Sequence, residues 1–256
     1  MDVAEYIGYV ASEGDRFATA AGNGDLDVDI PPCPDWDMRD LVRHLGLIHL
    51  WAAAIVETGD PEFFEVEDLP DLTDQWPDLA SAYPDDAGLV SWYHRTLANL
   101  VCVFESAPLD RDCPTFLPAP TPLTMWTRRQ ASEIAIHRYD AEIARGTSAG
   151  FDRDFATAML DEVLSGFAPR PRSLDLDSAK VIHVHAEDSD EHWYLTVGPE
   201  LTESSRTGSD ADLTLTGSAS DLYLLLWNRT PGSAVSMTGE IDLMDLWRGN
   251  FRVRWS

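Results

Sequence analysis

Apolar residues in the first half of the chain recur every three or four positions, which is the spacing of one buried face of an α-helix. Asp2 stands directly before the first such series and can cap a helix there. The series consists of Val3, Ile7, Val10, Gly14 and Phe17. We therefore expect a long helix at the N-terminus.

Three further helices are expected before residue 150. A proline-rich turn at 31–35 leads into the second, over residues 36–59, with Gly59 as its stop. The third covers residues 86–106. The fourth covers residues 121–145 and is closed by Gly146. Together the four predict a helical bundle.

The pattern changes after Gly150, where short runs alternate between apolar and polar positions as β-strands do. Helices and strands mixed in this way are typical of an α+β domain. We predict an N-terminal four-helix bundle over 1–150 and a smaller α+β domain over 151–256. The expected strands are 180–188, 192–198, 211–217 and 234–239, and the expected helices are 155–167, 218–229 and 240–250.

An acidic, proline-rich segment at 60–84 separates the second and third helices. Connections of this length inside a compact domain are often functional. The sequence leaves two alternatives open, a solvated crossover and a lid over an active site.

The chain has 18 basic and 45 acidic residues, a formal charge of -27. This charge argues against nucleic-acid and anionic-membrane partners, because both attract basic surfaces. The N-terminus lacks a signal-peptide pattern, and the apolar run 47–56 is too short to span a bilayer. Three cysteines without C-x-x-C spacing fit a reducing compartment. We expect a cytoplasmic monomer that acts on a small molecule.

Candidate chemistry lies on the fourth helix. Glu133 and His137 are four residues apart and therefore project from one helical face. That face is polar in the middle, and burial of a carboxylate and an imidazole without partners is unfavourable by several kcal/mol. The positions expected to point inward are Leu123, Trp126, Gln130, Glu133, His137, Asp140 and Ala144.

His44 on the second helix lies one residue from the apolar stripe of Leu41, Leu45 and Ile48 and can face the same interior. Two imidazoles and one carboxylate form a three-ligand set with one open position, as in catalytic zinc sites. The alternative is purely structural: Glu133 pairs with Arg129 one turn away, and His137 is a core histidine. Spacing alone does not separate these two interpretations.

Two segments carry a family resemblance. The stretch PPCPDWDMRDLVRHLGLIH (31–49) and the stretch RRQASEIAIHRYDAEIA (128–144) resemble the N-terminal signatures of the mycothiol-dependent maleylpyruvate isomerase family. That family has a DinB-like metal-binding bundle. The C-terminal segments DLYLLLWNR and VSMTGEIDLMDLW are similar to its smaller, sterol-carrier-like domain.

The resemblance implies specific roles. His44, Glu133 and His137 match the metal ligands, and zinc is the expected ion. Arg229 matches an arginine that faces the site, and Asp140 matches an acidic position that orients a ligand or the substrate. Arg128 and Arg138 are weaker candidates for anion binding, since both can simply face solvent.

The resemblance also implies a reaction. Mycothiol, the thiol of actinobacteria, would donate a metal-activated thiolate that adds to a double bond, permits rotation and leaves again. The same sulfur could stay attached, as in an S-transferase. Two alternatives from other classes are a metal hydrolase that uses bound water and a non-catalytic bundle that binds a ligand or partner.

Histidines also occur in the second half. His183 and His185 alternate with apolar residues at the period of a strand and therefore share one face. Two exposed strand histidines are the expected arrangement, with a second metal site as the alternative. The one G-x-S-x-G match, GTSAG at 146–150, follows a predicted helix and not a strand, so it lacks the context of a nucleophile elbow and serine hydrolysis has no support. The sequence contains no phosphate-binding glycine loop.

Overall fold

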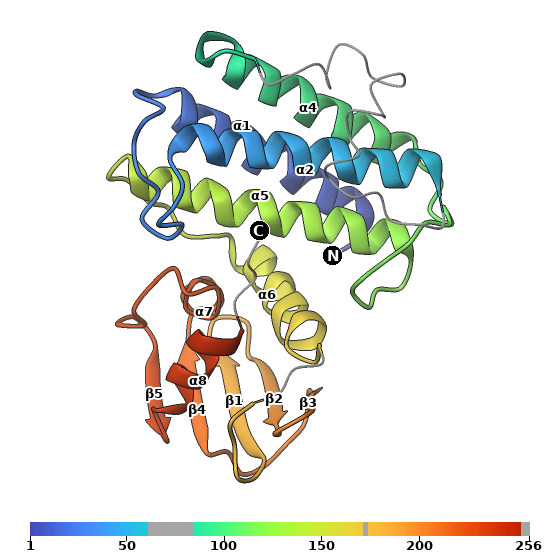
Figure 1. Cartoon of the computed structure of the whole chain (residues 1–256). Helices are drawn as coiled ribbons and strands as arrows, with labels where there is room; N and C mark the ends of the chain where they lie inside the picture. Colours follow the sequence, from blue (N-terminus) through green and yellow to red (C-terminus); the bar gives the residue numbers. More distant parts are fainter. Residues whose placement is uncertain (61–83, 171–173, 252–256) are drawn as a thin grey trace. The chain divides into compact units, whose positions relative to one another are not determined.

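The computed structural model describes residues 1–60, 84–170 and 174–251 of the 256-residue chain (Figure 1). The chain folds into two compact units, Met1–Ala149 and Gly150–Ser256. Nearly all of the acidic segment at 60–84, for which a lid was one alternative, lies outside the described residues.

The four helices predicted in the first unit are confirmed. They are α1 (Val3–Gly22), α2 (Met38–Thr58), α4 (Asp86–Ser106) and α5 (Pro122–Ala144). Their ends follow from local chemistry. Asp2 and Asp37 each form a capping box with the third helical residue, and Gly59 ends α2 in the left-handed conformation that glycine adopts without strain.

In this unit α1 and α2 lie between α4 and α5 (Figure 1). The approach of α2 to α4 depends on Gly46, because a Cβ atom there would overlap the ring of Trp92. By length and composition α2 could cross a membrane, yet 67% of its apolar window is buried inside the protein. Such burial is expected of the core helix of a bundle.

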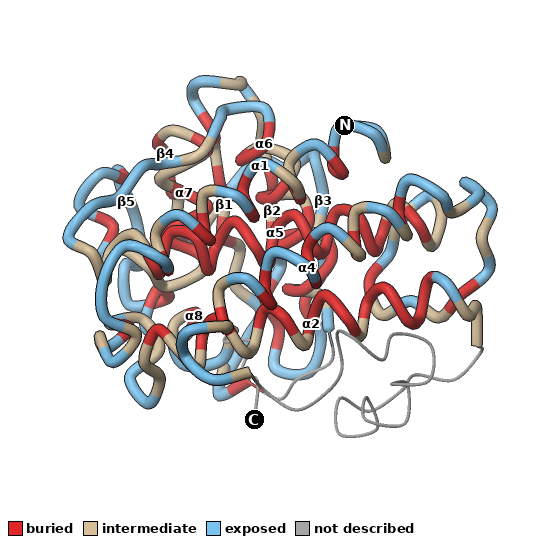
Figure 2. The backbone as a smooth tube through the Cα atoms, turned by 90° about the horizontal axis from the view of Figure 1, so that it is seen from above, coloured by how far each residue is buried: buried red, intermediate tan, exposed pale blue. Residues whose placement is uncertain are grey.

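Helix α5 is buried on all sides, since every residue from Met125 to Ala141 is buried (Figure 2). The predicted single inward stripe was therefore too narrow. It also included Ala144, which the structure leaves half-buried. A helix with so many buried polar groups needs partners for each of them. Most of the charged groups find these partners within the two clusters described below.

The second unit is α+β, as predicted. Helix α6 (Arg153–Asp161) continues into a π-helical turn (Glu162–Phe167), and α7 (Ala219–Leu226) packs on α6 and on strands β4 and β1. Helix α8 is Leu243–Asn250. The strands are β1 (Lys180–Ala186), β2 (Glu191–Val197), β3 (Thr202–Ser205), β4 (Leu213–Gly217) and β5 (Ser236–Gly239).

The five strands form one sheet in the order β3-β2-β1-β4-β5 (Figure 1). Strands β1 and β4 pair in parallel, and the other neighbours in this sheet are antiparallel. Strand β3 was missed in the sequence, because its residues TESS show no apolar alternation and owe their strand conformation to pairing with β2. Ile182 and Val184 of β1 face the core, and His183 and His185 face the other side of the sheet.

Candidate metal centre

Helices α2 and α5 bring together the three residues predicted as metal ligands. Glu133 Oε1 lies 3.1 Å from His44 Nε2 and 3.3 Å from His137 Nε2. One potential ligand atom from each of the three residues lies within 4.8 Å of the others. Glu133 and His137 are buried, and the side chain of His44 is 11% exposed. The cluster is therefore almost closed to solvent.

Two neighbours on α5 fix the orientation of these side chains. Arg129 Nη2 donates to Glu133 Oε2, which leaves Oε1 turned toward the histidines. Asp140 Oδ2 lies 2.9 Å from His137 Nδ1, so the Nε2 atom of that ring faces Glu133. Asp140 is fully buried and is thus not an ordinary surface acid. An acid behind a ligating imidazole commonly sets its tautomer and ring orientation.

The turn before α2 covers the cluster. Backbone hydrogen bonds from Trp36 N to Cys33 O (2.9 Å) and from Ile30 N to Trp36 O (2.9 Å) hold this turn. The ring centroid of Trp36 lies 4.8 Å from that of His44. Cys33 Sγ lies 3.9 Å from Asp140 Oδ2. Sequence reasoning gave Trp36 no place at the site, although it precedes the ligand-bearing helix in the proline-rich turn.

The charges of the cluster are coupled. Burial raises the pKa of Glu133, but the charge of Arg129 and the hydrogen bonds to His137 and His44 outweigh it and hold the pKa well below its ordinary value. Burial lowers the pKa of His44, and the hydrogen bond to Glu133 only partly opposes this. Burial also disfavours the charged form of His137, yet hydrogen bonds to Asp140 and Glu133 raise its pKa. Glu133 is thus a carboxylate and His44 a neutral ring with a lone pair.

The donor set fits a divalent ion. Around a tetrahedral ion with bonds of about 2.0–2.1 Å, ligand atoms lie about 3.3 Å from one another. The two distances from Glu133 Oε1 to the imidazole nitrogens, 3.1 and 3.3 Å, are close to this spacing. The structural alternative also holds in part, because Glu133 does pair with Arg129. That pair uses one carboxylate oxygen and leaves the other for the histidines.

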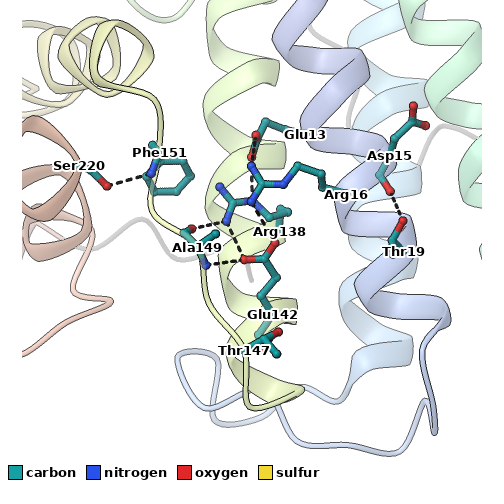
Figure 3. A network of polar contacts seen from close by, with 10 residues as sticks. All are labelled: Glu13, Asp15, Arg16, Thr19, Arg138, Glu142, Thr147, Ala149, Phe151 and Ser220. Atoms are coloured by element: carbon teal, nitrogen blue, oxygen red, sulfur yellow. Dashed lines mark hydrogen bonds and ion pairs between the residues drawn. The ribbon is translucent and has the colours of Figure 1, made fainter.

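The arginines considered for anion binding lie in different settings. Arg138, for which a solvent-facing position was the alternative to anion binding, is fully buried in ion pairs with Glu13 and Glu142 (Figure 3). Arg128 is also mostly buried and donates to Pro118 O at 2.8 Å. Arg229 belongs to the second unit, where it donates to the carbonyl oxygen of Trp227 at 2.9 Å.

Comparison with known proteins gives matches over both units. A family profile described as "Mycothiol maleylpyruvate isomerase N-terminal domain" matches residues 9–142, and one described as "MDMPI C-terminal domain" matches residues 151–245. A search of curated proteins found no match.

Among solved structures, the chain is similar to one described as "Crystal structure of the mycothiol-dependent maleylpyruvate isomerase". The TM-score is 0.65 at 14% identity, over 94% of this chain and 95% of the other. A histidine-to-alanine mutant of that enzyme matches with a TM-score of 0.64 and 14% identity, over the same shares of the two chains. At this identity the likeness establishes the fold.

Proposed function

The chain belongs to the mycothiol maleylpyruvate isomerase family, and from that premise we propose that it is a metal- and mycothiol-dependent enzyme. It would activate a thiolate for addition to a small, electrophilic and anionic substrate, as a cis-trans isomerase or an S-transferase. The observation that carries the proposal is the convergence of Glu133 Oε1 with the Nε2 atoms of His44 and His137 inside the bundle.

His44, Glu133 and His137 would hold the ion, and zinc suits two imidazoles and one carboxylate. When bound, such an ion supplies Lewis acidity that favours the thiolate form of a coordinating thiol. Mycothiol would supply the sulfur nucleophile for addition to a double bond, and its later departure would restore the double bond after rotation.

The chain's own residues would position these groups. Asp140 keeps Nδ1 of His137 engaged at 2.9 Å, so that Nε2 remains available to the ion. Arg129 keeps one oxygen of Glu133 engaged and neutralises part of its charge. Trp36 lies over the His44 ring and limits access of water from that side. We propose that Arg229 binds the negatively charged group of the substrate.

No cysteine is needed as a nucleophile in this scheme. Cys33→Ala should therefore retain activity, although Cys33 lies near Asp140. None of the three cysteines forms a disulfide, which agrees with a reducing, cytoplasmic setting. We propose that the enzyme works there as a monomer.

The test uses cobalt in place of zinc, because Co²⁺ reports sulfur ligation in its near-ultraviolet absorption. Addition of mycothiol to the cobalt-loaded protein should produce a sulfur-to-cobalt band, and activity should follow with maleylpyruvate. His44→Ala should lose the band, and His94→Ala, a change at an exposed histidine of α4, should keep it. A band that is absent at saturating thiol while cobalt stays bound would exclude the thiol chemistry and favour a hydrolase. Absence of bound cobalt would exclude both.

A further inference from the structure

A second group of ring side chains lies in the other unit, on the face of the sheet opposite its core. Strands β1 and β2 pair so that His185 stands directly across from His192, and His183 across from Tyr194. The sequence predicted that His183 and His185 share a face, and their rings are indeed parallel within 5°. It missed His192, because strand register is needed to bring that residue beside them.

Three ligand-type atoms converge at the end of this hairpin. The rings of His185 and His192 stack with centroids 4.1 Å apart. Asp190 Oδ1 lies 3.6 Å from His185 Nε2 and 3.7 Å from His192 Nε2. Both distances exceed those of hydrogen bonds but approach the roughly 3.3 Å between neighbouring ligand atoms of a tetrahedral metal site. The three side chains offer ligand atoms that all lie within 4.8 Å of one another.

The hydrogen bonding of the cluster also leaves nitrogen lone pairs on the side of Asp190. Because the rings of His185 and His192 are stacked, they would have to tilt apart to direct these lone pairs at one ion. His192 Nδ1 lies 3.0 Å from His183 Nε2. If Nδ1 donates this hydrogen bond, Nε2 of His192 carries the lone pair on the side of Asp190. His185 Nε2 is buried and has no hydrogen-bond partner among the described residues. A buried, unsatisfied nitrogen is unfavourable unless something else binds it.

An ion can reach this point and would be attracted to it. The side chain of Asp190 is 92% exposed, and that of His192 is 37% exposed. Four of the five residues in the segment 187–191 are acidic. Their negative field raises the local concentration of cations.

We propose that His185, Asp190 and His192 form a second divalent-metal site, with His183 as the partner that orients His192. Two imidazoles and one carboxylate suit zinc and its first-row neighbours rather than magnesium or calcium. Three protein ligands leave at least one position for water or another small donor. The site stands apart from the proposed enzymatic function, since none of its residues belongs to the bundle.

The test is a zinc titration of the full-length protein against a chromophoric chelator, in a His44→Ala background that removes the bundle site. One equivalent of zinc should remain. The added double change His185→Gln and His192→Gln should abolish it. Asp190→Asn should weaken binding by more than about 10-fold, because loss of even an outer partner typically weakens metal binding 10- to 100-fold. His183→Gln should weaken zinc binding less than Asp190→Asn does, because His183 orients His192 and does not itself bind the ion.

Two matched controls decide whether the binding is specific. Glu187→Gln removes a carboxylate from the same turn, and His94→Gln removes an exposed histidine elsewhere. Both should leave the zinc affinity within about twofold of the His44→Ala protein. If the control variants lost as much zinc affinity as the ligand variants, zinc would be attracted diffusely to an acidic surface. That result would overturn the proposal. Retention of the equivalent after the double histidine change would also overturn it.

Discussion

Helix α5 carries two buried polar clusters whose residues interleave along the helix, and they differ in the balance of donors and acceptors. In the first, Arg138 donates from Nε to Glu13 at 2.7 Å and from Nη1 to Glu142 at 2.8 Å (Figure 3). In the second, Glu133 Oε1 faces the nitrogens of His44 and His137. The first matches guanidinium donors with carboxylate acceptors, whereas the second gathers atoms that can each offer a lone pair.

This difference separates a structural network from a binding site. A guanidinium has only donors, so two carboxylates can satisfy it completely and nothing further is required. The two imidazole N–H groups can donate to Glu133 Oε1, but loss of these protons leaves three lone pairs that one cation can bind at once. We therefore expect changes in the Arg138 cluster to alter stability and changes in the Glu133 cluster to alter metal binding.

The largest stability effect is expected from Arg138→Met. It would leave the buried Glu13 and the partly buried Glu142 without their main cation, and breaking a buried ion pair typically destabilises by about 3–5 kcal/mol. Urea denaturation should show this loss in the free energy of unfolding. Below the unfolding transition, zinc affinity of the bundle should stay at the wild-type value. A large loss of zinc affinity in folded protein would mean that the two clusters are not separate.

The next largest effect is expected from Asp140→Asn, which keeps the shape of the side chain but weakens its hold on His137 Nδ1. Zinc affinity of the bundle should fall by about 10- to 100-fold. The measurement is a chelator competition in a His185→Gln and His192→Gln background, where the bundle is the one site expected to bind. Unchanged affinity would mean that Asp140 does not support the ligand.

His49 differs from the histidines of the Glu133 cluster, because it is a buried imidazole of α2 that contacts no carboxylate among the described residues. Its Nδ1 lies 3.2 Å from Thr96 Oγ1, and its Nε2 has no hydrogen-bond partner in the described part of the chain. Burial and then the charge of His44 lower its pKa from 6.5 to about 3. His49 therefore binds a proton below pH 6.5 in the unfolded chain but not in the folded protein. As a result, the free energy of unfolding falls as the pH decreases.

This contribution should amount to about 1.4 kcal/mol per pH unit, or about 2 kcal/mol at pH 5. His49→Leu should remove it, since Thr96 Oγ1 still donates to Tyr93 O at 2.8 Å. The check is the free energy of unfolding between pH 7 and pH 5 for both proteins. Parallel pH profiles would contradict the assignment.

The smallest effect is expected from Arg16→Met, the matched control for Arg138→Met. Arg16 contacts the same two carboxylates, but its side chain is 41% exposed. Exposed ion pairs contribute about 0–1 kcal/mol. Urea denaturation should show a decrease in the free energy of unfolding within that range. A loss as large as that of Arg138→Met would show that burial does not set the difference between the two arginines.

Local signals in the sequence predicted much of the fold. The cap at Asp2, the proline-rich turn at 31–35 and the stop at Gly59 placed α1 and α2 to within a few residues, whereas the cap at Asp37 was not recognised. Strand β3 was missed because only its pairing with β2 makes it a strand. The burial of α5 on all sides was missed because its sequence alternates charged and apolar residues without a clear face.

Sequence spacing predicted those residues of the candidate site that lie on the same helix, such as Glu133 and His137. Contacts between distant segments were harder to predict. The position of Trp36 over His44 depends on how the turn before α2 folds, and that of His192 beside His185 depends on strand register. Neither leaves a periodic signal in the sequence.

The most direct test of the central claim is a crystal structure of the zinc-loaded protein with anomalous diffraction at the zinc edge. We expect an anomalous peak about 2.0–2.2 Å from His44 Nε2, Glu133 Oε1 and His137 Nε2. A map without a peak there, in which these three side chains bond only to protein groups, would contradict it.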